Sequence, residues 1–272
     1  MARTDSRNIF LNDTDKSKLA EIYQGVIEAV QKAAISEQIK NKNYSGDATT
    51  GSVEISRFKN ATVNDLGTAR TAGKGDALKD NGKVTVNVDT DKEIVEEIAT
   101  KDIKLYGVAG IADKRKDNHT KRMAAYLDNE FFAKAEAEGK EFTPTKTKLV
   151  DKLEELILAV ETTKNDWVDG VDRDMLVLTV TPAVYSELSN FINEVPNSIK
   201  GFDEKLFNRV RIFSNHRQSH PAICMIEGAV AQLVTTDQYD AEKIPLSNDV
   251  ALELFFSKGT KAVMPDLIQF IK

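Results

Sequence analysis

The sequence contains one cysteine in 272 residues, Cys224, so it cannot form a disulfide bond within the chain. Cys224 lies in the apolar run 222–226, and this position predicts a small buried hydrophobic side chain. A reactive thiol would need a polar and electropositive surrounding, which this run does not offer. The stability of the fold is therefore expected to come from packing within the chain or between chains.

The sequence also lacks a long apolar run. No stretch approaches the roughly 20 apolar residues that span a bilayer, which excludes a transmembrane helix. Residues 1–7 are polar and lack the apolar core of a signal peptide. The protein is therefore expected to be made in the cytosol and either to stay there or to leave by cell lysis.

The sequence also has no excess of basic residues. The chain has 37 lysines and arginines against 43 acidic residues, and its net charge is −6. A dedicated nucleic-acid binder concentrates Lys and Arg for phosphate contacts, so this balance argues against one. It remains compatible with a protein that encloses DNA without holding it tightly.

Sequence motifs for catalysis or metal binding are absent: there is no GxSxG, P-loop, GxGxxG, CxxC or HExxH. The histidines are His119, His216 and His220. The last two are four residues apart, but residues 214–221 are typical of a loop between strands, and no third ligand follows from the spacing. Exposed loop histidines are therefore favoured over a metal site.

The acidic region around Trp167 is the candidate site for a different class of protein, an uncharacterised cytosolic enzyme. Asp166, Asp169, Asp172 and Asp174 surround Trp167. In a chain with 43 acidic residues, carboxylates close in sequence usually form a solvated face, and Trp167 is predicted to be a packing aromatic. We therefore assign no catalytic, cofactor-binding or metal-binding residue and expect no cofactor.

The apolar patterns predict a mixed α+β protein, because helical and strand-like segments follow one another in no regular alternation. The first helix is expected over residues 15–40 with Thr14 as its N-cap, and it is either a core helix or an arm that faces a partner. Further helices are expected over 111–137, from Pro144 through 149–160, and from Pro182. Strands are expected at 175–180, 210–213, 222–226, 229–234, 250–256, 261–264 and 267–271. No single point of the sequence divides the chain into separable halves, so one continuous domain is expected.

The most informative segment lies between two alternating stretches, 51–58 and 83–89, which are predicted to pair as a long hairpin. The residues between them are polar and rich in glycine, and such a long polar connection is uncommon in a compact domain. Three interpretations remain: a disordered insertion, a phosphate-binding glycine loop, or an arm that orders against a neighbouring chain. The glycine loop is the weakest, because Gly73-Lys74-Gly75 lacks the P-loop spacing and no helix follows directly.

The order of these segments resembles major capsid proteins of the Hong Kong 97 type. It does so through the polar N-terminal segment, the hairpin with a glycine-rich tip, the long helix, and the C-terminal stretches 228–234, 251–259 and 263–266. The resemblance covers essentially the whole chain and is greatest to siphophages of Gram-positive bacteria such as lactococci. It implies an N-terminal arm (1–44), an extended hairpin loop (45–88), a peripheral domain (89–143 and 232–258) with a long spine helix, and an axial domain (144–231 and 259–272).

In function, the resemblance implies a structural protein that self-assembles through pentamers and hexamers into the icosahedral head around double-stranded DNA. It would be found in the virion after assembly in the host cytoplasm, without sequence-specific DNA binding or membrane contact. Because about 44 residues precede the hairpin, we expect a separate scaffolding protein, together with a portal. An encapsulin-like shell that houses cargo is the alternative within the fold. Some relatives crosslink a loop lysine, but no partner can be assigned to Lys59, Lys74, Lys79 or Lys83, so no crosslink is expected.

Overall fold

The computed structural model describes residues 13–45, 51–61, 63, 65, 82–194, 202–203, 206–236, 240–244, 247 and 249–272. The chain divides into two compact units. Unit 1 comprises Met1–Gln38, Val88–Asp128 and Leu233–Gly259, and unit 2 comprises Ile39–Asn87, Asn129–Gln232 and Thr260–Lys272. Each unit is assembled from three segments that alternate along the sequence, which explains why the sequence offers no single boundary.

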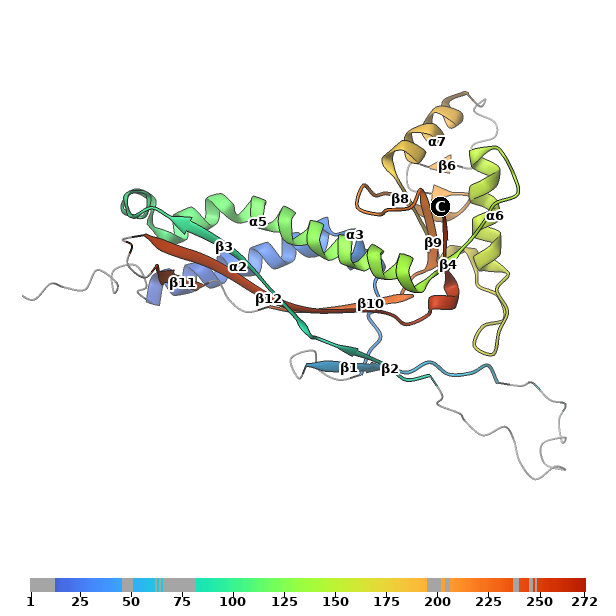
Figure 1. Ribbon diagram of the computed structural model, residues 1–272, viewed down its shortest axis with the longest axis horizontal. Helices are drawn as coiled ribbons and strands as arrows, with labels where there is room; N and C mark the ends of the chain where they lie inside the picture. Colours follow the sequence, from blue (N-terminus) through green and yellow to red (C-terminus); the bar gives the residue numbers. More distant parts are fainter. Residues whose placement is uncertain are drawn as a thin grey trace, which may run out of the picture. The chain divides into compact units, whose positions relative to one another are not determined.

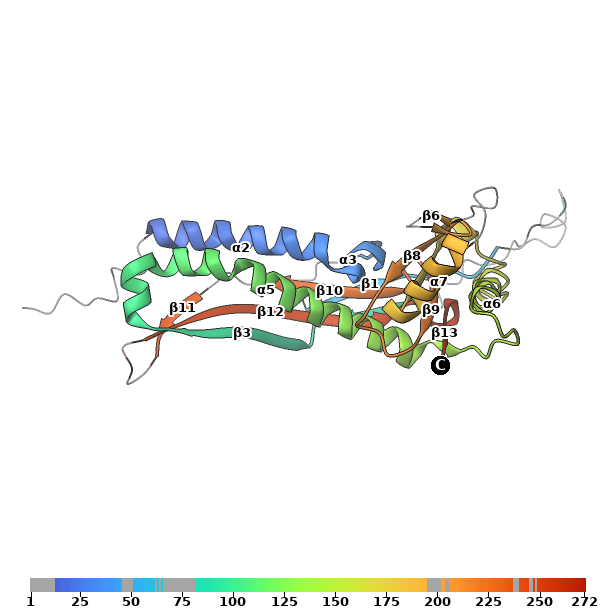
Figure 2. The same cartoon turned by 90° about the horizontal axis from the view of Figure 1, so that it is seen from above.

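Unit 1 combines two long helices with an antiparallel sheet (Figures 1 and 2). The helices are α2 (Asp13–Ala33) and the first part of α5 (Thr100–Glu138), and a short helix α3 (Ile35–Ile39) follows α2. The strands are β3 (Thr90–Ile98), β10 (Val230–Thr236), β11 (Asp240–Lys243) and β12 (Val250–Ala262). β12 pairs with β10, β11 and β3, and its register with β3 runs from Val250↔Ile98 to Lys258↔Thr90.

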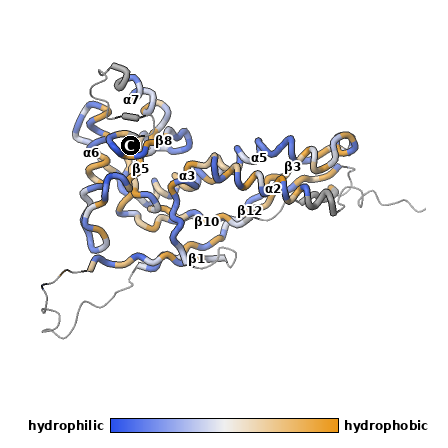
Figure 3. The backbone as a smooth tube through the Cα atoms, turned by 180° about the vertical axis from the view of Figure 1, so that it is seen from behind, coloured by the Kyte–Doolittle hydropathy of each residue, from blue (hydrophilic) through white to orange (hydrophobic). Residues whose placement is uncertain are grey.

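The core of unit 1 lies where α2, α5 and the sheet meet, and hydrophobic and hydrophilic residues alternate along both helices (Figure 3). Each helix turns one apolar stripe inward, as helical spacing requires. The buried members of this core include Val26, Val30, Met123, Leu127, Leu252 and Leu254.

The single predicted helix over 15–40 is wrong in one respect, because the structure divides it into α2 and α3 at Ala34. Asp128 causes the division. Its carboxylate, fully buried on α5, accepts hydrogen bonds from the backbone N–H groups of Ile35 (3.3 Å) and Ser36 (2.9 Å), so these amides start a new helix. The predicted N-cap is also wrong: α2 begins at Asp13, and Thr14 lies inside it.

We expect Asp128→Ala to lower the free energy of unfolding by about 1–3 kcal/mol, because it leaves two buried backbone donors without their acceptor. Asp128→Asn keeps one acceptor oxygen and should lose less. Urea denaturation followed by circular dichroism measures both, with Asp117→Ala, an exposed carboxyl on the same helix, as the control. An Asp128→Ala midpoint equal to that of the control would show that the cap is not needed.

The long helix predicted over 111–137 is confirmed, but α5 begins earlier, at Thr100. The two parts join at Gly107, whose backbone (φ 71°, ψ 163°) departs from helical geometry. An L side chain rarely adopts this conformation, so glycine permits the kink. The helix ends at Glu138, directly before Gly139.

Unit 2 is built on a seven-stranded mixed sheet with the order β4-β13-β9-β5-β8-β7-β6. Its strands are β4 (Lys140–Glu141), β5 (Leu176–Val180), β6 (Phe202–Asp203), β7 (Leu206–Phe207), β8 (Val210–Ser214), β9 (Ala222–Ile226) and β13 (Ile268–Ile271). The helices are α6 (Leu149–Glu161) and α7 (Pro182–Glu194), and the short 3-10 turns are η2 (Arg173–Met175) and η4 (Pro265–Leu267). β5 lies between β8 and β9 and all of its residues are buried, as its continuous apolar run predicts. The predicted α+β class is confirmed.

The amphipathic stripe predicted for α6 is confirmed, since Leu153, Leu156, Ile157 and Val160 are buried. The predicted helix start at Pro144 is wrong. Glu155 explains the difference, because its carboxylate accepts hydrogen bonds from the backbone N–H groups of Thr145 (2.8 Å) and Lys146 (3.1 Å). These amides are satisfied by a side chain, and the helix begins only at Leu149.

Two strand predictions are also corrected. Residues 250–256 and 261–264 are not separate strands, because β12 continues from Val250 to Ala262. β3 was not predicted, since it carries acidic and basic residues on much of its length and only Ile98 is buried. Its place is fixed by pairing with β12, which the local pattern does not reveal.

The predicted pairing of the two alternating stretches is confirmed. β1 (Ser52–Ile55) and β2 (Val84–Asn87) are antiparallel, with a register from Ser52↔Asn87 to Ile55↔Val84. Val53, Ile55 and Val86 are buried while Glu54 and Thr85 are exposed, so one face of this ribbon is covered and the other faces solvent. The glycine-rich tip, 66–81, lies outside the described residues.

Candidate functional site

Beyond its paired strands, the hairpin exposes large apolar side chains. Phe58 is 51% exposed and Val63 is 96% exposed, and Tyr44, just before β1, is 44% exposed. Single exposed apolar residues are common, but these three flank one two-stranded ribbon. A ribbon of two strands is marginal by itself, so its outer apolar residues favour contact with another surface.

The hairpin base packs against Trp167, in the loop between α6 and η2. The Arg57 guanidinium carbon lies 5.3 Å from the indole centroid and the Lys59 Nζ atom lies 5.5 Å from it. The prediction of a packing aromatic is confirmed. The sequence did not indicate its partners, which lie more than 100 residues away along the chain.

The four aspartates near Trp167 do not converge on one point. Asp166 pairs with Lys59 (2.7 Å), Asp169 with Lys164 (2.8 Å) and Asp174 with Arg209 (2.9 Å). Lys59 holds the pKa of Asp166 below its usual range, and Lys164 does the same for the pKa of Asp169. A lowered pKa keeps the Asp166 and Asp169 carboxylates ionised, which is the opposite of what a general acid needs.

The β8–β9 loop carries His216 and His220, as predicted. The His220 ring stacks on Phe270 with centroids 4.5 Å apart, and Glu136 accepts hydrogen bonds from the backbone N–H groups of Ser219 and His220. His216 is exposed. Among the described residues, no group of three or more His, Cys, Asp or Glu side chains could hold a metal ion.

His119, in unit 1, is fully buried on α5, and its Nε2 atom lies 3.1 Å from a carboxylate oxygen of Glu96 on β3. Arg115, one turn earlier on α5, forms a two-pronged hydrogen bond to the same carboxylate. This hydrogen bond is the main reason that the pKa of Glu96 lies below its usual value. The cluster links helix to sheet, and no local pattern indicated it, because Glu96 lies in a strand that is recognised only by its pairing with β12.

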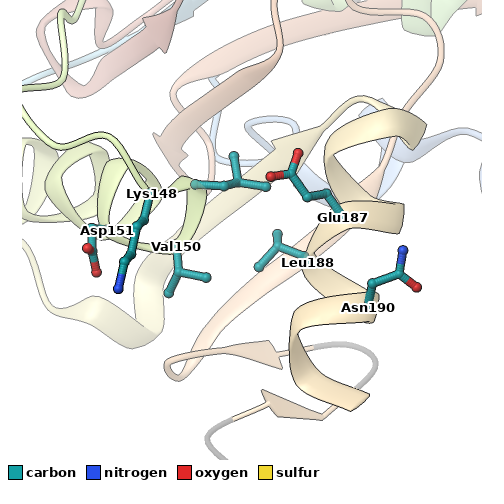
Figure 4. Close-up of a pocket in the computed structure, with 7 residues that line it drawn as sticks. Lys148, Val150, Asp151, Glu187, Leu188 and Asn190 are labelled. Carbon is teal, nitrogen blue, oxygen red and sulfur yellow. The ribbon is translucent and has the colours of Figure 1, made fainter. Parts of the chain in front are cut away.

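A groove of about 500 Å³ lies between α6 and α7 (Figure 4). Val150 and Leu188 form its apolar floor between the two helices, with Lys148 and Asp151 on the α6 side and Glu187 on the α7 side. The lining therefore mixes apolar and charged side chains from both helices.

The thiol of Cys224 is buried in β9, as predicted, and burial raises its pKa far above the ordinary value. We expect a thiol reagent to leave the folded protein unmodified at neutral pH and to label one site per chain in denaturant, because the thiolate is the reactive form. Mass spectrometry measures the labelling, with Ser214→Cys, at an exposed position of β8, as the reactive control. Rapid labelling of the folded wild type would contradict the buried position.

The sequence matches no protein-family model and no curated protein. Comparison with solved structures does find similar folds. A chain of Mycobacterium phage Che8 superposes with a TM-score of 0.61 at 17% identity, covering 82% of this chain and 84% of that one. The capsid structure of cyanophage P-SCSP1u gives a TM-score of 0.58 at 12% identity over 85% and 84% of the two chains. The chain has the fold of phage capsid proteins. 

A similar fold is also found outside the phages. A virus-like particle from Pyrococcus furiosus superposes with a TM-score of 0.57 at 13% identity, covering 93% of this chain and 98% of that one. Identities this low establish a common fold and nothing finer. The described part of this capsid fold contains no helix that is both long and apolar enough to cross a membrane.

Proposed function

We propose that the chain is the major capsid protein of a tailed phage, assembling through pentamers and hexamers into an icosahedral head around double-stranded DNA. The observation that carries the proposal is the capsid fold, which extends over more than four fifths of both this chain and its Che8 counterpart. The exposed Phe58 and Val63 side chains add support, because a shell subunit must offer apolar surface to its neighbours.

The same proposal gives each segment a role: N-terminal arm (1–44), extended hairpin loop (45–88), peripheral domain with its spine helix (89–143 and 232–258) and axial domain (144–231 and 259–272). The division into two compact units supports it, since unit 1 holds most of the proposed peripheral segments and unit 2 most of the axial ones. The role is structural and not enzymatic. The subunit would assemble in the host cytoplasm with a separate scaffolding protein and a portal, and the phage would be a siphophage of a Gram-positive host.

A second candidate is an encapsulin-like shell that houses protein cargo. The full-length likeness to the Pyrococcus particle favours it, although the TM-score is lower than that of the Che8 chain. Neighbouring portal and terminase genes would support the phage head, whereas a neighbouring cargo-enzyme gene would support the encapsulin-like shell.

Expression of the chain with and without candidate scaffolding proteins tests the proposal. We expect closed particles of uniform size in electron micrographs, eluting far ahead of a 30.2 kDa monomer in size-exclusion chromatography. Mild acid or salt changes should dissociate them into capsomers that reassemble. A strictly monomeric protein under all conditions, scaffolding protein included, would overturn the proposal.

A further inference from the structure

The two ends of the glycine-rich segment are held by one compact set of contacts in unit 2. The chain leaves β1 through residues 56–61 and returns to β2 through Gly82 and Lys83. The backbone N–H of Arg57 donates to the carbonyl of Gly82 at 3.2 Å. This bond continues the antiparallel pairing of β1 with β2 past its last pair, Ile55 and Val84. Outgoing and returning strands are therefore still paired where they reach the loop between α6 and η2.

The first anchor is an ion pair. Arg57 donates two hydrogen bonds to Asp266 in η4, Nη1 to Oδ1 at 2.6 Å and Nη2 to Oδ2 at 2.7 Å. Both side chains are largely buried, with 14% and 17% of their surface exposed. The Asn165 amide donates a further bond of 2.6 Å to Asp266. The two parallel hydrogen bonds fix the orientation of the Arg57 side chain as well as its distance from Asp266. A lysine, with its single ammonium group, could not fix that orientation.

The Arg57–Asp266 ion pair is intact at neutral pH because the Asp266 carboxyl is ionised. Burial alone would raise the pKa of Asp266, but the hydrogen bonds from Arg57 and Asn165 outweigh it, and the pKa lies below its usual value. A carboxyl with a lowered folded pKa stabilises the protein above its unfolded pKa, and that stabilisation is lost as pH falls through the folded pKa. The Arg57–Asp266 pair therefore stays ionised at neutral pH, and its contribution is lost only as pH falls through a carboxyl pKa that lies below the ordinary aspartate value.

The second anchor is Trp167. Its loop is held in shape by Asn165, whose side-chain oxygen accepts hydrogen bonds from the backbone N–H groups of Trp167 (2.8 Å) and Val168 (2.9 Å). The indole faces the Arg57 and Lys59 cations of the outgoing strand. The backbone N–H of Asn60 donates to the carbonyl of Asp166 at 3.0 Å, which binds this strand to the loop.

The returning strand meets the same ring at Gly82. A Cβ atom there would lie 2.8 Å from the Arg57 carbonyl oxygen and 2.8 Å from Cη2 of the indole. Only glycine permits this approach, so the returning strand touches both the outgoing strand and Trp167. One side chain thus contacts both ends of the segment.

We propose that Trp167 and Asp266 are positioning residues that anchor the hairpin base on both sides, at Arg57–Asn60 and at Gly82, and hold it in the conformation that shell assembly requires. The assembly role rests on the proposed function, whereas the anchoring itself does not. Trp167 would act by contact with two strands at once, and Asp266 by orienting Arg57. The hairpin base would then need no reordering when the subunit meets a neighbour.

Hydrogen exchange of the isolated subunit, followed by NMR, tests the anchoring. In Trp167→Ala and Asp266→Asn we expect the amides of Arg57 and Asn60 to exchange at least about tenfold faster than in the wild type. Trp167→Phe retains an aromatic face and should restore most of the protection at both amides. The exchange rates of the β5 and β9 amides should be the same in all three variants as in the wild type, which would show that the fold is intact. Arg209→Gln, which removes an exposed ion pair elsewhere in unit 2, is the matched control.

Assembly of the same variants supplies the second measurement. Trp167→Ala and Asp266→Asn should give a lower yield of closed particles or particles of irregular form, and Trp167→Phe and Arg209→Gln should assemble as the wild type does. Unchanged exchange at Arg57 and Asn60 would overturn the anchor. Faster exchange with particles of normal yield and form would overturn its role in assembly. If the wild type itself builds no particles, the proposed function fails, and the exchange rates still decide whether the anchor exists.

Discussion

Replacement of residues 65–81 by a short Gly-Ser linker is expected to leave a folded, soluble subunit that no longer builds stable shells. The buried face of the ribbon, Val53, Ile55 and Val86, and the contacts at Trp167 all lie outside the deleted stretch. The circular dichroism spectrum and the melting temperature should therefore stay close to those of the full chain. Assembly should be lost because the removed stretch is the proposed contact with a neighbouring subunit.

The measurement is the fraction of protein in particles, from sedimentation and electron microscopy under conditions in which the wild type assembles. A variant with residues 65–81 scrambled keeps the length and composition of the segment, so it separates the effect of sequence from the effect of length. Particles of normal yield from the deletion would refute the interface role. An unfolded deletion variant would show instead that the segment stabilises its own subunit.

The largest loss of stability is expected from Leu178→Ala. Leu178 is fully buried at the centre of β5, opposite Cys224 on β9 and Ile212 on β8. Truncation to alanine at such a site leaves a cavity and costs about 2–5 kcal/mol. In a protein of this size that corresponds to a fall of roughly 5–15 °C in melting temperature.

Leu158→Ala is the matched control, because this leucine on α6 is 43% exposed. Its truncation should change the free energy of unfolding by less than about 0.5 kcal/mol. Scanning calorimetry of the isolated subunits compares the two directly. Equal losses in both variants would mean that the burial assigned to β5 is wrong.

Much of the fold could be predicted from apolar patterns. In elements such as β5 and α6, the positions of the apolar residues directly reflect which side chains are buried. β5 has a continuous apolar run and is buried throughout, and α6 has a stripe at helical spacing. The pairing of β1 with β2 followed from two alternating stretches. Local sequence carries this information, because apolar residues on the buried face repeat with the period of the helix or strand.

The remainder could not be predicted because its causes lie far away in the sequence. The break after α2 depends on Asp128, which lies 92 residues from Ser36. β3 is largely solvent-exposed and is held in place by β12. The hairpin base depends on Arg57 and Asp266, which are separated by 209 residues. The sequence indicated that Trp167 packs against something, and only the fold brings its partners to it.

The alternation of segments between the two units has a consequence for biosynthesis. The last strand of unit 1 is β12, and unit 2 is completed by β13, which reaches Ile271. Neither unit can therefore complete its sheet before the segment that contains β12 and β13 has been translated. Contacts between such distant segments make folding slow, with apolar strands exposed in the meantime. Until β12 and β13 are available, the strands that pair with them keep unpaired edges that can contact other chains.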